Sequence, residues 1–298
     1  MPPGEHKRKT PTKRHRRALT MTALAAPALV LMVAINAYPV LYAAQQSLHD
    51  GSLIAEGPFV GLENYSAVLT DPSFWKAVRF TIMFTLCGVL GSWLAGYALA
   101  LAFRRRFYGR SVLKVAFLLP WVVPVVVTSM SWNWLVATAS SPLPRLFTAI
   151  GFPDVLFLAD PTMAVIMVCL FKVWISFPFM FLMMSAALEG IDGSVYEAAT
   201  VDGAGGVASL LHITLPLTAK STFISWVLMS MFTINDFPTI YLLTGGGPVN
   251  STTSLVVLAY RSVFQSFQPG YGVAVAFIMT AALIGISLAL FHSIRKAD

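Results

Sequence analysis

The chain has 298 residues, of which 57% are hydrophobic and 11% are charged, and its formal net charge is +7. Soluble domains carry about 25% charged residues, so the composition excludes an ordinary soluble domain and indicates an integral membrane protein. The basic residues gather beside apolar runs, which is typical of a membrane topology signal and argues against nucleic acid as a partner.

Residues 1–18 form a basic tail, which we predict to be cytoplasmic and to lie near anionic membrane lipid. Its Lys and Arg residues before the first apolar run are Lys7, Arg8, Lys9, Lys13, Arg14, Arg16 and Arg17. The apolar run that follows is too long for the core of a cleaved secretory signal, so we expect an uncleaved first span.

Six apolar runs are long enough to cross a bilayer, which takes about 20 helical residues. We predict spans at about 19–43, 77–103, 112–138, 161–188, 221–243 and 272–293. Most Lys and Arg residues lie in the tail, in the loops after the second and fourth spans, and at the C-terminus. Cytoplasmic segments carry the excess of positive charge. The predicted fold class is therefore an all-α integral membrane protein with six transmembrane helices and both termini cytoplasmic, in one transmembrane domain over 19–298.

Motifs that carry catalytic or metal chemistry are absent from the sequence. It contains no G-x-x-x-x-G-K-[ST] phosphate-binding loop and no H-E-x-x-H zinc motif. Cys87 and Cys169 lie inside apolar runs, which favours neither a disulfide framework nor a metal site. We therefore predict no catalytic residue, no metal site and no cofactor on this chain.

A polar, glycine-containing loop at about 189–216 separates the fourth and fifth spans. The run from Ser194 to Glu197 fits a capping box, which predicts a short helix that begins at Ser194. Gly203, with Gly205 and Gly206, is expected to end it. A second short helix is predicted at about 207–213, with Pro216 as its end. Two such helices would present a small apolar surface to another protein; the alternative is a connector that lies flat on the membrane.

The same loop resembles the E-A-A loop of ABC-importer permeases. The residues that carry the resemblance, with the tyrosine before them, are Tyr196, Glu197, Ala198, Ala199, Asp202, Gly203, Ala204, Ile213, Leu215 and Pro216. The resemblance implies a coupling helix that docks into a cleft on a separate ATPase subunit. ATP and Mg²⁺ would then be bound by that partner, and this chain would be a non-catalytic transport subunit.

Three further stretches resemble carbohydrate importers of the maltose-transporter type. They are FVGLENYSAVLTDPSFWKAV (59–78), LLPWVVPVVV (118–127) and YLLTGGGPVNSTTSL (241–255). This resemblance implies a multi-pass permease of the inner membrane that assembles with a second homologous permease, two ATP-binding subunits and an extracytoplasmic sugar-binding protein. An importer of glycerol-phosphate or a polyol, an ion-coupled secondary transporter and a membrane scaffold stay open as alternatives.

Two charged residues inside the spans are candidates for a substrate pathway. Lys172 lies about 11 residues into the fourth span, near mid-bilayer, where a charge costs ~3 kcal/mol. In one interpretation Lys172, Asn235 and Asp236 offer polar groups to sugar hydroxyls. Trp174 and Phe237 would then offer apolar ring faces. In the other interpretation, Lys172 and Asp236 form a structural ion pair between spans.

Overall fold

A computed structural model describes residues 13–52, 54–55, 57–104, 107–152 and 155–297 of the chain. The first twelve residues of the predicted basic tail lie outside this part. The described residues form helices joined by loops, with one isolated bridge between His49 and Phe59. In chain order the helices are α1 (Lys13–Ser47), α2 (Glu63–Thr70), α3 (Pro72–Ala102), α4 (Arg110–Val122), α5 (Val125–Val136), α6 (Pro142–Ala149), α7 (Pro161–Glu189), α8 (Gly193–Val201), α9 (Gly206–Ser209), the π-helical turn η1 (Leu210–Thr214), α10 (Leu215–Ile234), α11 (Phe237–Thr244), α12 (Leu255–Phe264) and α13 (Pro269–Ala297).

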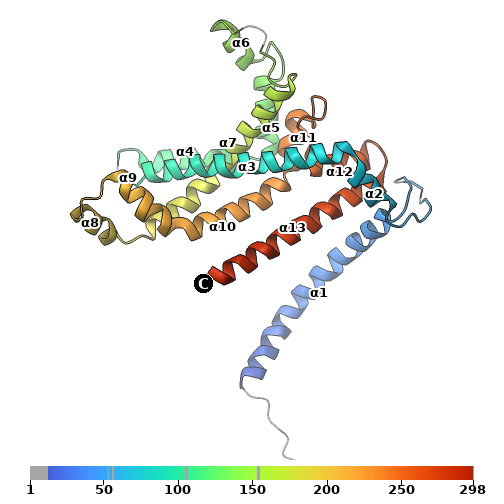
Figure 1. Cartoon of the computed structure of the whole chain (residues 1–298), viewed down its shortest axis with the longest axis horizontal. Coiled ribbons are helices and arrows are strands. Elements are labelled where there is room, and N and C mark those ends of the chain that lie inside the picture. The colour runs from blue at the N-terminus through green and yellow to red at the C-terminus, as the bar shows by residue number, and fades with distance from the viewer. Residues whose placement is uncertain (1–12, 53, 56, 105–106, 153–154, 298) are drawn as a thin grey trace, which may run out of the picture.

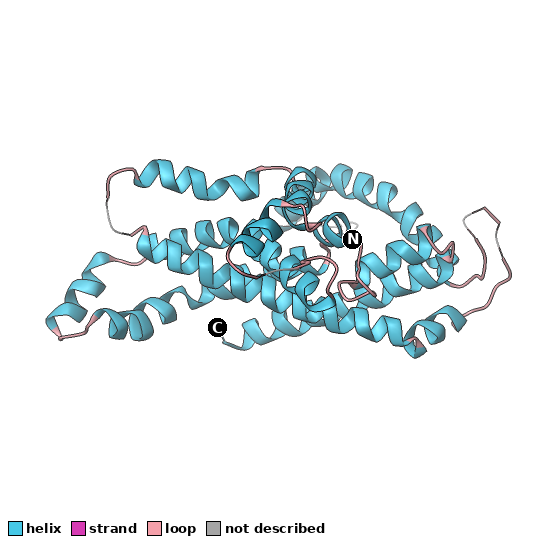
Figure 2. Cartoon of the chain, turned by 90° about the horizontal axis from the view of Figure 1, so that it is seen from above, coloured by secondary structure: helices cyan, strands magenta, loops and turns pink. Residues whose placement is uncertain are grey.

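The long helices of the described chain give it the dimensions of a membrane bundle. Five helical segments are long and apolar enough to cross a bilayer: α1, α3, α7, the segment α9–α10 and α13. The helices α3, α7 and α10 lie side by side along the long axis, whereas α1 and α13 lean away from them (Figures 1 and 2). The predicted all-helical class is confirmed, and four of the six predicted spans fall on single long helices.

The third predicted span, 112–138, is not one continuous helix. The chain forms α4 and α5 instead, at 91° to one another. The break falls at Val123, which is extended with ψ of 134°, directly before Pro124. A residue that precedes proline is pushed out of the helical region by the proline ring, and proline itself has no N–H to donate. The break is a feature that the structure adds to the predicted span.

The fifth predicted span, 221–243, is also interrupted. The helix α10 ends at Ile234, and α11 begins at Phe237. Asp236 adopts φ of −79° and ψ of 90° between them, and it caps α11 by accepting a hydrogen bond from the Thr239 amide. An aspartate that satisfies a free amide and a proline in the first helical turn are both typical helix starts, so Asp236 and Pro238 favour a new helix here.

The core of the bundle lies where α3 packs against α7, which form its most extensive helix pair. Phe84 and Phe171 are fully buried in one cluster, and Met184 is fully buried in a second cluster nearer to α8. Both helices are apolar around most of their circumference, as expected when one face meets protein and the other meets lipid. This contact fixes α7, which carries Lys172 and leads directly into α8.

Candidate functional site

A buried ion pair joins the fourth predicted span to the break in the fifth. The Lys172 Nζ lies 2.7 Å from the Asp236 Oδ2, and the two side chains are 7% and 10% exposed. The second oxygen, Oδ1, accepts the bond from the Thr239 amide. Both carboxylate oxygens therefore have a donor, which is the condition under which a buried charge pair is tolerated.

The other three predicted pathway residues surround this pair unevenly. Asn235 is exposed, and its amide Nδ2 donates to the Met231 carbonyl, 2.9 Å away. Trp174 and Phe237 are partly buried and pack against the same core cluster as Phe171. Phe237 also stacks on Tyr241, with a ring separation of 4.7 Å. The structure thus brings Lys172 and Asp236 into contact, whereas the two aromatic residues serve as packing groups in the described chain.

An apolar cavity of about 720 Å³ lies between α4, α5 and α7. Its lining includes Pro120, Trp132, Trp174 and Phe177. Trp174 is the one predicted pathway residue among its lining. The cavity lies beside the bend between α4 and α5.

The helix α8 carries the E-A-A residues and projects beyond the ends of α3, α7 and α10 (Figure 1). Its start is capped by Asp192, whose Oδ1 accepts from the Ser194 amide at 3.0 Å. The expected capping box of Ser194 and Glu197 was therefore wrong, because an acidic residue two positions earlier supplies the cap. Hydrogen bonds from the Ser194 backbone and side chain lower the pKa of Asp192. The cap is consequently present above the ordinary pKa and is lost as pH falls through the lowered value.

The end of α8 depends on one glycine. Gly203 has φ of +81°, a left-handed conformation that side chains with a Cβ rarely adopt. The Ala204 amide bonds to the Ala199 carbonyl at 2.8 Å, and the Gly203 amide bonds to the Thr200 carbonyl at 3.1 Å. This pair of bonds is a Schellman motif. The expectation that Gly203 ends the helix is confirmed.

The second half of the loop differs from the prediction. The expected short helix at 207–213 does not stop at Pro216, because α9, η1 and α10 form one continuous helical segment. Pro216 lies in the first turn of α10 instead. A π-helical turn widens the local hydrogen-bond spacing, so the helix can pass a residue that has no N–H to donate. The loop therefore contains one detached helix, α8, and an extension of α10.

Tyr196 ties α8 to this extension. Its hydroxyl lies 3.1 Å from the Thr214 hydroxyl in the π-helical turn. The guanidinium of Arg104 lies over its ring, 4.2 Å from the centroid, as a cation–π contact. Leu215 packs against the core cluster that contains Met184, and Ile213 is half-buried. The position of α8 is thus linked to α3 and to the start of α10.

One side of α8 is left open. Glu197, Ala198 and Asp202 are exposed, whereas Ala199 is buried against the chain. Val201 and Val207 flank the turn and are 87% and 72% exposed. Neither these two valines nor Arg104 was predicted from the sequence as a functional residue. Val201 and Val207 stand next to the stretch 202–206 of small and polar residues, which is the signal that could have identified them.

Metal chemistry has no visible basis in the described part of the chain. No group of three or more His, Cys, Asp or Glu side chains there could hold a metal ion.

The chain is similar to known membrane transport proteins over most of its length. Residues 88–296 match the sequence profile of the family described as binding-protein-dependent transport system inner membrane component. The sulfoquinovosyl glycerol transport system permease protein of Agrobacterium fabrum is 32% identical over 282 residues, which are 94% of this chain and 92% of that protein. The trehalose/maltose transport system permease protein of Thermococcus litoralis is 33% identical over 259 residues, 87% of each chain.

Solved structures share the fold. A chain of a bacterial ABC transporter involved in the import of the acidic polysaccharide alginate aligns with a TM-score of 0.78 at 20% identity, over 95% of this chain and 98% of that one. A second alginate transporter structure, in complex with an alginate pentasaccharide-bound periplasmic protein, aligns with a TM-score of 0.81 at 19% identity, over 96% and 97% of the two chains. At this identity the likeness concerns the arrangement of helices.

Proposed function

Because the chain belongs to the family of binding-protein-dependent transport system inner membrane components, we propose that it is the non-catalytic permease subunit of an ATP-driven importer for a carbohydrate. It is a multi-pass protein of the inner membrane. The observation that carries the proposal is α8. It is a short helix that projects past the bundle, is fixed by Tyr196, and ends in the Gly203 turn between two exposed valines.

The geometry of α8 supports a role as the coupling helix. Exposed apolar side chains on a projecting helix gain free energy when a partner covers them, by about 25 cal/mol for each Å² of apolar surface buried. The apolar part of the exposed surface is small, since it includes Ala198 and Val201 of α8 and Val207 beyond the turn, so it suits a narrow cleft. We assign that cleft to an ATPase subunit, which would hold ATP and Mg²⁺. A displacement of α8 then reaches α3 through Arg104 and α10 through Thr214.

The complete transporter in this proposal has further subunits. A second homologous permease would face this chain across a central pathway, with two ATPase subunits below and a sugar-binding protein outside. The loops that carry most positive charge, with α8 and both termini, would lie in the cytoplasm. ATP-driven closure of the ATPases would switch the two permeases between inward-facing and outward-facing states as rigid bodies.

A carbohydrate is the substrate class that the relatives support best. The names of the two relatives above refer to sulfoquinovosyl glycerol and to trehalose and maltose. Asn235 is exposed beside the ion pair, and its side-chain Oδ1 can accept a hydrogen bond from a hydroxyl while Nδ2 donates to Met231. An importer of glycerol-phosphate or a polyol is the alternative within the same class of transporter.

The test is reconstitution of the complex, purified from its native membrane with its companions, into proteoliposomes. We expect uptake of a labelled disaccharide that needs ATP and the sugar-binding protein and that does not respond to collapse of the proton gradient. Uptake without nucleotide that stops when the gradient is collapsed would instead establish an ion-coupled carrier. If an Asn235→Ala variant assembles and transports at the normal rate, Asn235 is not part of the substrate pathway.

The Gly203 turn gives a sharper test of the coupling assignment. Gly203→Val should lower sugar-stimulated ATP hydrolysis and uptake, because a left-handed residue with a branched Cβ costs roughly 1–2 kcal/mol. Gly203→Asn should retain most of the activity, since asparagine tolerates this conformation. Gly205→Val is the matched control, because Gly205 has φ of −71° and open space around it. Full coupling in the Gly203→Val complex would count against a role of this turn in coupling.

A further inference from the structure

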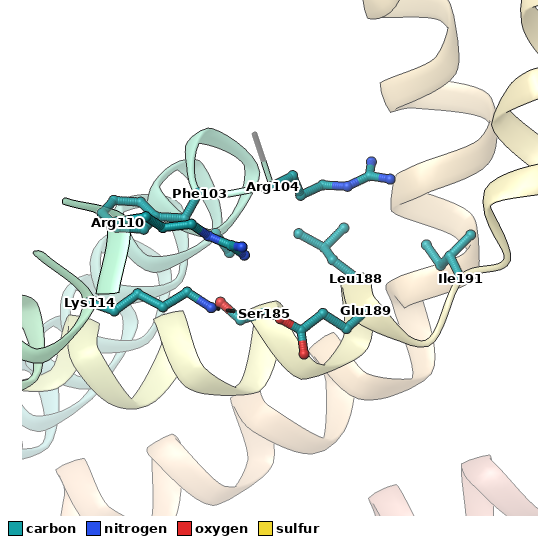
Figure 3. A pocket seen from close by; sticks show the side chains of 9 residues that line it. Phe103, Arg104, Arg110, Lys114, Ser185, Leu188, Glu189 and Ile191 are labelled. Carbon is teal, nitrogen blue, oxygen red and sulfur yellow. Dashed lines mark ion pairs between the residues drawn. The ribbon is translucent and has the colours of Figure 1, made fainter. Parts of the chain in front are cut away.

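A second cavity lies at the same end of the bundle as α8, between the end of α3, the start of α4 and the end of α7 (Figure 3). Its volume is about 230 Å³. Phe103 and Leu188 are among its apolar lining residues. Three of its lining side chains are cationic, one is anionic and one is a hydroxyl: Arg104, Arg110, Lys114, Glu189 and Ser185.

The charges in this cavity do not balance. Lys114 Nζ lies 3.7 Å from Glu189 Oε1, and both side chains are partly exposed, so this ion pair is weak. Within the described residues, neither Arg104 nor Arg110 forms an ion pair with a carboxylate. The cavity therefore keeps two uncompensated positive charges, and an anion that enters it would be stabilised.

Two polar groups that line the cavity lack partners in the described chain. The Nε of Arg110 and the hydroxyl of Ser185 are both buried and make no hydrogen bond. Figure 3 shows the Arg110 and Lys114 side chains extending toward Ser185 and Glu189. A buried donor without an acceptor costs free energy, and an anionic oxygen would remove that cost.

The backbone adds to the positive electrostatic potential of the cavity. The helix α4 begins at Arg110, and its N-cap residue, Gly109, has no side chain that could accept from the first amides. The N-terminus of a helix carries a partial positive charge and free N–H groups, which favours phosphate. Arginine adds a planar fork of donors that matches phosphate oxygens.

The surroundings indicate what the phosphate is attached to. The surface of α4 beside the cavity is apolar, with Val112, Leu113 and Val115 exposed by 72%, 43% and 63%. A soluble phosphate gains nothing from such a surface, whereas acyl chains do. We propose that the cavity binds the phosphate of an anionic phospholipid in the leaflet that faces α8. This inference rests on the proposed function only in that it takes this leaflet to be the cytoplasmic one.

Occupation of the site would also reach the coupling helix. Arg104 lines the cavity and at the same time lies over the Tyr196 ring of α8. A phosphate in the cavity competes for this guanidinium, so the bound lipid and the orientation of α8 are linked through one side chain. Phosphatidylglycerol should therefore change the rate of ATP hydrolysis in the complex relative to a membrane of phosphatidylcholine alone.

The test uses the purified complex in nanodiscs of phosphatidylcholine with or without phosphatidylglycerol, and counts the lipids that stay bound by native mass spectrometry. We expect phosphatidylglycerol to be retained selectively. Arg110→Gln should weaken this retention about fivefold, the effect of one basic residue at an anionic surface. Lys220→Gln, which removes the same charge from α10 outside the cavity, should leave retention unchanged.

Other outcomes would overturn the proposal. Equal retention by the wild-type and Arg110→Gln complexes would do so, as would release of the phosphatidylglycerol by millimolar inorganic phosphate, which would indicate a phosphate site without preference for lipid. Weaker binding of the ATPase subunits in Arg110→Gln with normal lipid retention would assign the cavity to a protein contact. If Arg110→Gln does not assemble, Ser185→Met fills the cavity without a charge change and should lower retention as well.

The lipid site and the proposed transport function can be refuted independently of one another. A complex that keeps phosphatidylglycerol through Arg110 but shows no nucleotide-dependent uptake would refute the proposed function and leave the lipid site standing. A complex with normal uptake, in which Arg110→Gln retains as much phosphatidylglycerol as wild type, would refute the lipid site alone.

Discussion

Two side chains, Lys172 and Asp236, hold the centre of this chain together across 64 positions of sequence. Their ion pair is more than nine-tenths buried on the lysine side, and it lies where a helix is interrupted. The methylene Cγ of Lys172 also lies so close to Gly88 that a Cβ there would approach it to 3.0 Å. The pair therefore links α3, α7 and the start of α11 at one point.

Removal of one partner should cost more stability than removal of both. Lys172→Met or Asp236→Asn leaves a buried charge or strong donor without its partner, a loss of about 3–5 kcal/mol. The double variant should lose less than the sum of the single variants, since asparagine can still cap α11 and methionine fills the space of the lysine. Thermal unfolding in one detergent gives the comparison.

The control for this cycle is Lys114→Met with Glu189→Gln, a pair that is 3.7 Å apart and partly exposed. Exposed pairs contribute at most about 1 kcal/mol, so this cycle should show little coupling. Strictly additive losses for Lys172 and Asp236 would contradict the ion pair as a structural link.

At the level of elements, the contact between α3 and α7 depends on small residues spaced four apart. Gly88, Ser92, Gly96 and Ala100 are all buried along one stripe of α3. Small residues allow helix backbones to approach closely in a membrane. At Gly96 the α3 backbone lies directly against the α7 backbone, because a Cβ added to Gly96 would lie 2.6 Å from the Phe181 amide nitrogen.

We expect Gly96→Ala to separate the two helices and to lower stability by roughly 1–3 kcal/mol, the usual cost of an overpacked core. Gly285→Ala in α13 is the control, because nothing lies within 4 Å of its added Cβ. It should be neutral, or more stable by up to about 1 kcal/mol through helix propensity. The unfolding midpoint of each variant decides the matter. A Gly96→Ala protein as stable as wild type would show that the helices can adjust.

At the scale of the whole molecule, the chain is asymmetric in how it buries its helices. More than half of the most apolar stretch of α7 is buried within the chain. None of the corresponding stretch of α1 is buried, although α1 contacts α13. The helices α5 and α6 extend away from the bundle, at the top of Figure 1. Such open apolar surface is covered by lipid or by another subunit, which fits a chain that works as part of an assembly.

The positive-inside bias predicts the orientation of this molecule in the membrane, and labelling can test that prediction. In a background without Cys87 and Cys169, Ser140→Cys should react with a membrane-impermeant maleimide in intact spheroplasts. Ser194→Cys, at the start of α8, should react only after the membrane is opened. The two positions serve as controls for one another, and the reverse pattern would place α8 outside the cell and end its assignment as a coupling helix.

Local chemistry explains which features could be predicted from the sequence. Apolar runs located the helices because bilayer thickness fixes their length, and Gly203 identified its turn because few other residues adopt that conformation. The direction of α5 could not be predicted, since it depends on contacts with α11 such as the hydrogen bond that the side-chain Nδ2 of Asn133 donates to the Leu243 carbonyl. The pairing of Lys172 with Asp236 was one of two open interpretations, because hydropathy carries no information on which spans touch.

The right angle between α4 and α5 has a consequence for solvent. The break lies about 20 Å along α4 from its start, well inside a hydrocarbon layer of about 30 Å. Pro124 is the N-cap residue of α5 and supplies no side-chain cap, so the first amides of α5 need acceptors that hydrocarbon does not supply. The adjacent cavity, lined in part by Thr128 and Ser131, offers room for water to reach them. We expect water to occupy this cavity at that depth, so that a polar solute beside the protein would have less hydrocarbon to cross.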